Sequence, residues 1–394
     1  MNVLMLSDVY FPRVNGVSTS MQTACRELVR MGHEVTVVAP DYGSVDEAGD
    51  FEIIRLPSRK IFFDPEDRLI KRSALDTALR ELARRRFDVI HIHTPFRAHE
   101  LGVRLRRLTG CPAIESYHTY FEQYVAHYLP WMPQKATRFA VRAASRRLVR
   151  GIDHLIVPTE EMAAVLRGYG IVTPASVIPT GILLDEFAGG DGVRFRERLG
   201  LAADQPTLVT VSRVAAEKNI DFLLEVADRL RAEFANLMFV IAGEGPDEAR
   251  LKQITARLGL GANVRFVGNL DRRTTLLDCY RAADVFVFAS GTETQGLVLI
   301  EAMALGVPIV STAQMGTATV LAGARSARVS AKEVGEFAGH VAALLRSPVE
   351  RATLSAQAPA DARRWSAPAL MQRVADLYAS LPRLASAVPA STAS

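Results

Sequence analysis

Two carboxylates stand eight residues apart in an apolar stretch, GTETQGLVLIEAMALGVPIV, which spans residues 291–310. The pattern predicts a helix from about Gly296, followed by a strand. Glu293 would then lie in the loop before the helix and Glu301 about five residues inside it, roughly 7.5 Å along the axis. Because an unpaired buried carboxylate costs several kcal/mol, each needs a partner or a ligand.

A ligand lying across the start of this helix could contact both carboxylates. The amides of Gly296 and Leu297 would bind a phosphate, because a helix N-terminus favours anions. Glu293 could accept hydrogen bonds from sugar hydroxyls, and Glu301 could accept those of a ribose. The alternative is that Glu301 is a buried ion-pair partner and Glu293 an exposed loop residue.

A cation pair follows a strand in TVSRVAAEKN, where Arg213 ends the strand and Lys218 stands at or before the next helix start. Two positive charges at the carboxyl end of a strand suit a diphosphate, and they could neutralise an anionic leaving group. The alternative is that both side chains, near Glu217, are solvated.

Two glycine-containing loops are further candidates for ligand contact. In SDVYFPRVNGVSTSM, Gly16 stands between a strand and a helix, where free backbone N–H groups could receive a phosphate. In IAGEGP, Gly243 and Gly245 either approach a ligand or turn the chain, and the turn is slightly favoured. Each loop by itself is also compatible with an ordinary turn.

The elements that must position these residues alternate between strand-like and helical patterns. Short apolar runs such as NVLMLSD, EVTVVAP and FDVIHIH are separated by amphipathic segments, and the pattern restarts at TLVTVSR. This alternation predicts an α/β fold with two Rossmann-like, doubly wound parallel sheets. The boundary is expected near residues 172–180, with the site between the two domains at the carboxyl ends of strands.

Size and composition agree with two globular domains. The chain has 394 residues, 49% of them hydrophobic, and no apolar run long enough to span a membrane without a charge. The N-terminus enters a strand without a basic leader, so we expect a cytoplasmic protein. The three cysteines, Cys25, Cys111 and Cys279, lack disulfide or zinc spacing and are expected to be packing residues.

These motifs together resemble those of the retaining glycosyltransferases of family 4, which have the GT-B fold of two Rossmann-like domains. GTETQGLVLIEAMALGVP resembles the family's Glu-x7-Glu signature, PRVNGVSTS its first glycine loop, ESYHTYF its histidine motif and SRVAAEKN its phosphate-binding pair. The resemblance extends to Tyr378. It implies an acceptor-binding domain over residues 1–172, joined by a C-terminal helix at 365–382, a donor-binding domain over 173–364, and a disordered tail from 383 to 394.

The resemblance also implies roles for individual residues. Arg213 and Lys218 would hold the diphosphate of a nucleoside diphosphate sugar, Glu301 its ribose and Glu293 the hydroxyls of the transferred sugar. Gly16 would admit the distal phosphate, and His118 would lie beside the anomeric carbon. The expected donor site has two groups: catalytic residues His118, Glu293, Arg213 and Lys218, and donor-binding residues Gly16, Gly243, Gly296, Leu297 and Glu301. No metal ligand and no other cofactor is expected.

The implied reaction moves a hexose, with retention, from a donor of the UDP-glucose or GDP-mannose type to an acceptor hydroxyl. Two departures from the family pattern matter. Gln295 stands where an aromatic residue is frequent, and TQG resembles the branch that glycosylates diacylglycerol or related lipids. The acidic residue common after PTGI is displaced here to Asp185. Alternatives are a soluble or polysaccharide acceptor, and a sugar-nucleotide epimerase or phosphorolytic enzyme of the same architecture.

A basic segment suggests where a lipid acceptor would be met. Residues 51–150 hold 20 Lys and Arg against 10 Asp and Glu, a local net charge of +10. No aromatic platform or recognition motif accompanies this charge, which disfavours a nucleic-acid partner. Helical spacing places basic residues, with Phe139 and Val149, on one face, and Trp131 stands beside it. This face predicts peripheral binding to an anionic membrane, on the inner face of the cell membrane, through Trp131, Lys135, Arg138, Arg142, Arg146 and Arg150.

Overall fold

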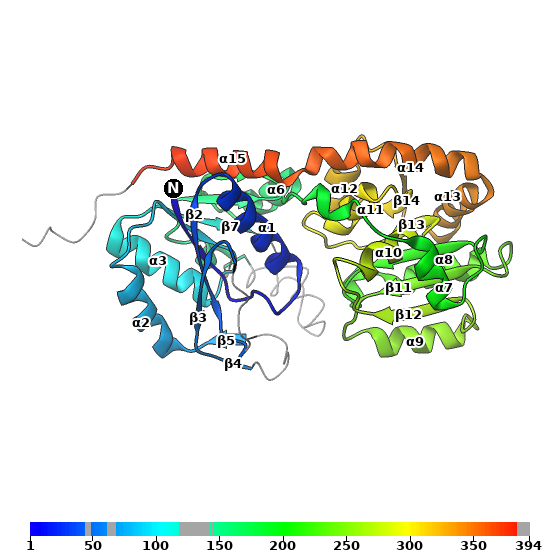
Figure 1. The fold of residues 1–394 in the computed structure, drawn as a ribbon, viewed down its shortest axis with the longest axis horizontal. Helices are drawn as coiled ribbons and strands as arrows, with labels where there is room; N and C mark the ends of the chain where they lie inside the picture. The colour runs from blue at the N-terminus through cyan, green and yellow to red at the C-terminus, as the bar shows by residue number, and fades with distance from the viewer. Residues whose placement is uncertain (44–48, 61–67, 118–141, 144, 384–394) are drawn as a thin grey trace, which may run out of the picture. The chain divides into compact units, whose positions relative to one another are not determined.

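A computed structural model of the chain describes residues 1–43, 49–60, 68–117, 142–143 and 145–383. The chain forms two compact units, one comprising Met1–Gly181 and the residues from Ala367 onward, the other Ile182–Ser366 (Figure 1). The expected boundary after residue 172 is therefore too early. The reason is that β9 (Ala175–Val177) pairs in parallel with β8 (His154–Val157) and completes the first sheet.

The first unit contains a seven-stranded parallel sheet with the order β3-β2-β1-β6-β7-β8-β9. Helices flank the sheet, and a short antiparallel pair, β4 and β5, stands apart from it (Figure 1). The remaining elements are β1 (Asn2–Leu6), α1 (Gly16–Arg30), β2 (Glu34–Pro40), β3 (Glu52–Leu56), β4 (Ser58–Lys60), β5 (Arg68–Ile70), α2 (Arg72–Leu82), β6 (Val89–Ile92), α3 (Arg97–Thr109), β7 (Ala113–Ser116), α6 (Glu160–Gly168) and α15 (Ala367–Ser380).

The second unit repeats this plan with a six-stranded parallel sheet of order β12-β11-β10-β13-β14-β15. Two parallel sheets with helices on their faces confirm the expected fold class. The elements are η1 (Leu184–Phe187), α7 (Gly192–Leu199), β10 (Thr207–Val211), η2 (Ala216–Lys218), α8 (Ile220–Leu230), β11 (Met238–Ala242), α9 (Glu248–Arg257), β12 (Val264–Gly268), α10 (Thr275–Arg281), β13 (Val285–Phe288), α11 (Leu297–Ala304), β14 (Ile309–Thr312), α12 (Gly316–Leu321), β15 (Ala327–Ser330), α13 (Val334–Arg346), α14 (Pro348–Ala362) and η3 (Arg363–Trp365).

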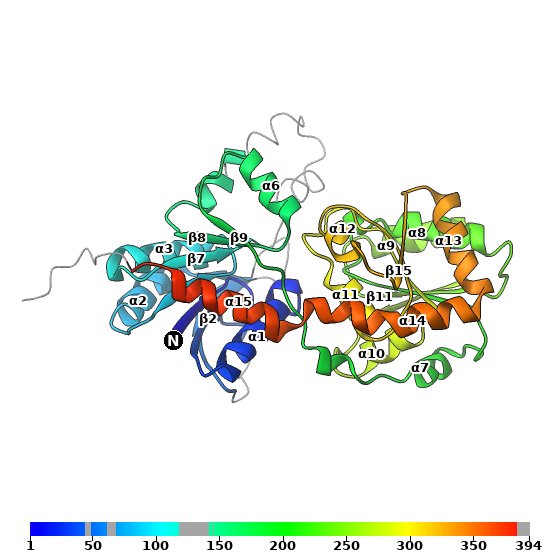
Figure 2. The same cartoon turned by 90° about the horizontal axis from the view of Figure 1, so that it is seen from above.

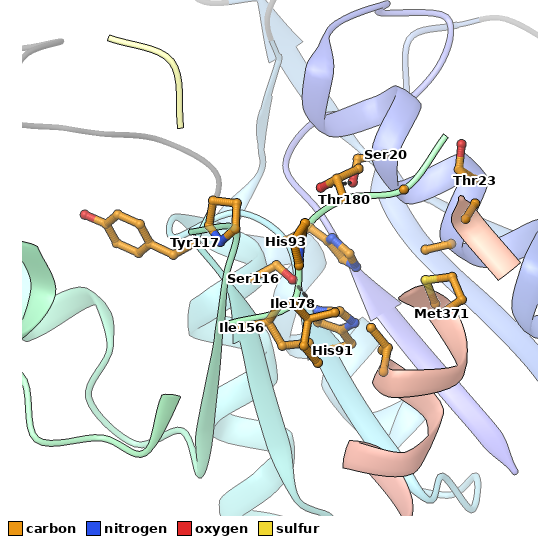
Figure 3. A pocket seen from close by; sticks show the side chains of 16 residues that line it. Ser20, Thr23, His91, His93, Ser116, Tyr117, Ile156, Ile178, Thr180 and Met371 are labelled. Carbon is orange, nitrogen blue, oxygen red and sulfur yellow. Dashed lines mark hydrogen bonds between the residues drawn. The ribbon is translucent and has the colours of Figure 1, made fainter. Parts of the chain in front are cut away.

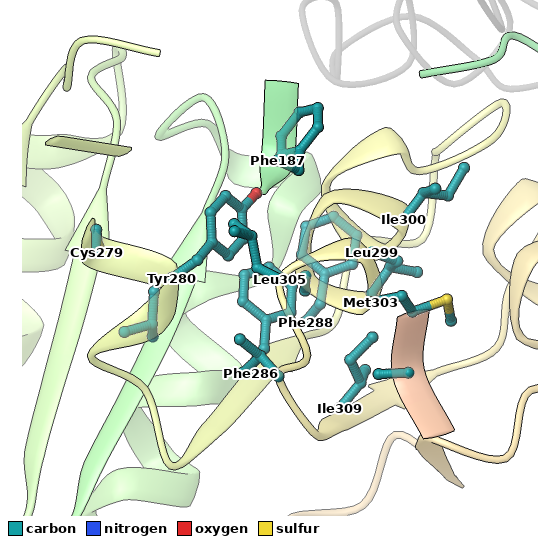
Figure 4. Packing of buried hydrophobic residues seen from close by; sticks show 14 of the residues in the cluster. Phe187, Cys279, Tyr280, Phe286, Phe288, Leu299, Ile300, Met303, Leu305 and Ile309 are labelled. Carbon is teal, nitrogen blue, oxygen red and sulfur yellow. The ribbon is translucent and has the colours of Figure 1, made fainter. Parts of the chain in front are cut away.

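The central strands are apolar on both faces because helices cover both. In β13, Phe286 and Phe288 belong to one core cluster, whereas Val285 and Val287 belong to the other. Figure 4 shows the first of these clusters, where the phenylalanines lie among side chains from α10 and α11. A run such as VFVF, without polar alternation, is what a strand buried between two helix layers requires.

The C-terminal helix packs in the first unit. Met371, Val374 and Tyr378 of α15 share a buried cluster with Met21 and other residues of α1, and Figure 2 shows the two helices beside each other. The family resemblance implies a C-terminal helix at 365–382 that joins the first domain, and α15 packs there. All three cysteines are buried and reduced, in agreement with the expected packing role.

In each sheet the strand order reverses at one point. The chain proceeds outward from β1 to β2 and β3, then returns to place β6 on the other side of β1. The second sheet reverses in the same way between β10 and β13. Loops that follow the two strands at such a point diverge to opposite faces, which leaves a crevice where ligands bind in doubly wound folds.

Candidate functional site

The cation pair follows β10, one of the two strands at the reversal point of the second sheet. Arg213 is exposed two residues beyond the end of the strand, and Lys218 ends the single turn η2. Asn219 then adopts a left-handed conformation with φ of 52° and begins α8. This short connection sends the chain into α8 within a few residues, so both cations stay near the carboxyl edge of the sheet.

Glu293 lies in the loop after β13, the other strand at this reversal point. Its Oε1 atom is 2.5 Å from Nζ of Lys218, and the two side chains are only 20% and 17% exposed. Glu293 is therefore not the exposed loop residue of the alternative interpretation. Lys218, which is expected to bind the diphosphate, therefore forms an ion pair with Glu293, which is expected to bind the transferred sugar.

The loop that carries Glu293 is supported by the start of α12. The amide of Gly316 donates to the carbonyl oxygen of Glu293 at 2.9 Å. A Cβ atom on Gly316 would lie 2.2 Å from the carbonyl carbon of Thr294, so only glycine permits this approach. Met315, immediately before Gly316, has φ of 51° and ψ of −131°, a backbone conformation that residues other than glycine rarely adopt.

Glu301 lies where the sequence placed it, in the fifth position of α11. It is 2% exposed, and both of its oxygens have partners: Nη2 of Arg272 is 2.6 Å from Oε1, and the Tyr280 hydroxyl is 2.8 Å from Oε2. Glu301 is thus a buried ion-pair partner, which was the alternative interpretation, and it stays a candidate ribose ligand. Sequence analysis missed Arg272 and Tyr280, although it required some partner for this carboxylate.

Gly296 is the N-cap of α11, with φ of 92°, and within the described ranges no side-chain hydrogen bond caps this helix end. The first amides of α11, including that of Leu297, have no acceptor within the helix. Gly243 has an explanation that needs no ligand, because a Cβ atom there would lie 1.9 Å from the carbonyl oxygen of Ser212. The close approach of two loops requires a glycine at position 243. Contact between Gly243 and a donor stays a prediction.

Gly16 is the first residue of α1, which Asn15 caps through a reciprocal pair of hydrogen bonds with Ser18. A Cβ atom on Gly16 would meet no heavy atom within 4 Å among the residues that the structure describes. Packing there does not require glycine. Close approach of a ligand to the helix N-terminus would explain a glycine at this position. Gly16 therefore stays a candidate for the distal phosphate.

A pocket opens at the carboxyl edge of the first sheet (Figure 3). His91 and His93 line it from β6 and the residue after it, together with Ser116 of β7 and Met371 of α15. The two imidazole rings lie 4.1 Å apart, and Nε2 of His91 is 2.8 Å from the Ser116 hydroxyl oxygen. Two histidines at alternate positions along an extended segment share a face, which is the sequence signal that could have identified them.

Asp8 bridges β1 and the start of α3 at the reversal point of the first sheet. Its carboxylate accepts hydrogen bonds from the Thr94 hydroxyl at 2.7 Å and from the amides of Arg97 and Ala98. Burial raises the pKa of Asp8 to about 6 although these hydrogen bonds oppose the shift. Sequence analysis did not single out this residue.

In the described part of the basic segment, Arg142, Arg146 and Arg150 are exposed as expected of a membrane face, but Val149 is not. Val149, placed there with the cations, is 4% exposed, so that assignment is wrong. The Arg142 guanidinium lies 5.7 Å from the Tyr169 ring centre, and Nε of Arg146 donates to the Tyr169 carbonyl oxygen. Helical spacing alone cannot tell which side a neighbouring helix covers. His118, Trp131, Lys135, Arg138 and Phe139 lie outside the described residues.

Among the described residues, no group of three or more His, Cys, Asp or Glu side chains could hold a metal ion. Over the same ranges, the helices are too short or too polar to cross a membrane.

Two family models match the chain, and together they cover most of both units. The model described as Glycosyltransferase Family 4 matches residues 14–186, and the model described as Glycosyl transferases group 1 matches residues 193–361. The second match contains the cation pair, Glu293 and Glu301. The first contains Gly16 and the pocket-lining histidines.

Individual proteins are also similar to this chain. An alpha-monoglucosyldiacylglycerol synthase of Streptococcus pneumoniae is 35% identical over 79% of this chain and 71% of its own. A D-inositol 3-phosphate glycosyltransferase of Catenulispora acidiphila is 34% identical over 74% of this chain and 70% of its own. The crystal structure of Anabaena HepE in complex with UDP-glucose covers 97% of this chain and 100% of its own with a TM-score of 0.74, at 17% identity.

Proposed function

Because the chain belongs to the retaining glycosyltransferases of family 4, which have the GT-B fold, we propose that it glycosylates a lipid hydroxyl. The acceptor would be diacylglycerol or a phospholipid headgroup. The donor would be a nucleoside diphosphate sugar, with UDP-glucose the first to test and GDP-mannose the second. The observation that carries the donor half is the Lys218–Glu293 pair at the reversal point of the second sheet.

The chemistry assigns each charge a task. The bond between the anomeric carbon and the β-phosphate oxygen breaks, and Arg213 and Lys218 stabilise the anionic diphosphate that leaves. The acceptor oxygen attacks the same face of the sugar, and its proton passes to the leaving phosphate oxygen. Glu293 holds the sugar hydroxyls while positive charge develops at the anomeric carbon, and no separate base is required.

Three observations support a lipid acceptor. One relative is named as a glucosyldiacylglycerol synthase, and the TQG sequence at residues 294–296 resembles the lipid-glycosylating branch. The local charge of +10 over residues 51–150 would attract an anionic membrane. These features agree with an enzyme that meets its acceptor at a lipid surface.

A soluble acceptor is the second candidate, because another relative is named as a D-inositol 3-phosphate glycosyltransferase. The same basic region could attract an acceptor phosphate. The two candidates differ in what the protein binds before donor is added, since only a lipid acceptor requires the protein at a membrane.

The test offers the purified protein UDP-glucose or GDP-mannose with vesicles containing diacylglycerol and anionic phospholipid, or with inositol phosphate. We expect glycolipid product, release of nucleoside diphosphate, and vesicle binding that weakens as salt rises. Transfer to the soluble acceptor alone, without vesicle binding at low salt, would contradict the lipid assignment.

A charge-reversal pair locates the membrane surface. Arg138→Glu should reduce vesicle binding and glycolipid formation several-fold. The matched control is Arg257→Glu on α9, an exposed arginine of the second unit, which should bind vesicles as the wild type does. Equal binding by both variants would remove Arg138 from the proposed surface.

A further inference from the structure

We propose that Tyr280 is a positioning residue for the donor nucleotide, whose hydroxyl holds the Glu301 carboxylate in the orientation that receives the ribose. This inference deepens the proposed function and rests on it, because it takes Glu301 as the ribose ligand. None of the sequence motifs contains Tyr280, which stands 21 residues before Glu301 in the chain.

The contact geometry is that of a fixed carboxylate. Tyr280 donates to Oε2 of Glu301 at 2.8 Å, and Arg272 donates to Oε1 at 2.6 Å. One donor on each oxygen prevents the carboxylate from rotating about its terminal bond. An ionised carboxylate has about four acceptor positions, so capacity is left for hydroxyls of a ligand.

Tyr280 is held by the core around it, which makes it a better anchor than a surface residue. Its side chain is 0% exposed and belongs to the core cluster that includes Phe286 and Leu299. The Tyr280 and Phe286 ring centres are 5.4 Å apart, and Figure 4 shows the tyrosine packed within this cluster. The core thereby fixes the position of the Tyr280 hydroxyl, which donates to Glu301.

The charge states also suit this role. Burial and the neighbouring Glu301 raise the pKa of Tyr280 well above its ordinary value, so the hydroxyl keeps its proton and donates. The attraction of Glu301 raises the pKa of Arg272. Arg272 is a poor choice for a test, because its removal would leave a buried carboxylate without its counter-ion. Tyr280→Phe removes one hydroxyl and keeps the ring.

The experiment measures binding of UDP and of 2′,3′-dideoxy-UDP, or of the corresponding GDP pair, to wild type and to Tyr280→Phe. If the hydroxyl acts on the ribose through Glu301, the variant should bind UDP about 5- to 20-fold more weakly, whereas its affinity for the dideoxy analogue should change less than two-fold. In transfer assays KM for the donor should rise by a similar factor while kcat changes less than two-fold.

Tyr378→Phe is the matched control, because it also removes a buried hydroxyl, one that lies 2.6 Å from Nδ1 of His91 in the first unit. It should leave the preference for ribose over dideoxyribose unchanged. Equal weakening of both nucleotides by Tyr280→Phe, or no weakening of UDP, would overturn the positioning role. A wild type that binds UDP and its dideoxy analogue equally would instead overturn Glu301 as the ribose ligand, a failure of the proposed site.

Discussion

Nζ of Lys218 lies 2.5 Å from Oε1 of Glu293, across the point where the strand order of the second sheet reverses. Lys218 follows β10 and Glu293 follows β13, and these strands are adjacent and parallel. The two residues are expected to serve different parts of one donor, the diphosphate and the transferred sugar. Their pairing means that a change at either residue also alters the charge environment of the other.

Removal of either cation should slow transfer strongly. We expect Arg213→Ala and Lys218→Ala each to reduce kcat/KM by more than about 100-fold, or roughly 2.7 kcal/mol of transition-state stabilisation, because the leaving diphosphate loses a counter-charge. Lys252→Ala is the control, since that exposed lysine pairs with Glu248 on α9. Activity equal to the wild type would show that the cations are surface features.

Glu293→Gln should separate sugar transfer from nucleotide binding. Most of the turnover should be lost, because the hydroxyls of the transferred sugar lose a charged hydrogen-bond acceptor. The affinity for the nucleoside diphosphate should be kept or improved. The improvement is expected because Lys218 is no longer paired with a carboxylate. Calorimetric titration with UDP or GDP, beside a steady-state assay, measures both. Near-normal turnover would remove Glu293 from the site.

Met315→Gly should be more stable than Met315→Ala. Met315 occupies a backbone conformation, φ of 51° and ψ of −131°, that glycine adopts without a penalty. Both variants lose the packing of the half-buried methionine side chain, so the difference between them isolates the backbone. Relief of strain, about 1–3 kcal/mol, exceeds the entropic cost of glycine, about 0.4–1 kcal/mol. The melting temperature of the glycine variant should be a few degrees above that of the alanine variant, and equal or reversed melting temperatures would refute the strain.

Asp8 should make stability depend on pH between about 4 and 6. Burial raises its folded pKa from 3.8 to about 6, so the folded state binds the proton more tightly than the unfolded state. This stabilising contribution is complete below about pH 4 and is lost as pH rises through about 6. Urea unfolding of wild type and Asp8→Asn across this range should show their difference in stability shifting against the wild type as pH rises. A constant difference would contradict the raised pKa.

The sequence by itself determined the elements whose patterns are local. Apolar runs such as NVLMLSD and EVTVVAP identified strands of the parallel sheets, and the expected start of a helix near Gly296 placed Glu293 before α11 and Glu301 inside it. The edge strands β3 and β15 were missed, because each is short and partly exposed and lacks a long apolar run. The motifs also identified the family, since they depend on residue type and spacing along the chain.

Only the tertiary structure decided which side chains meet. Lys218 and Glu293 are 75 residues apart, and they pair because β10 and β13 are neighbours although two strands separate them in the chain. The partners of Glu301 come from α10 and the loop before it, and Val149 is buried where helical spacing had placed it outside. Hydrophobic spacing reports local backbone geometry, whereas side-chain pairing depends on strand order and helix packing between distant segments.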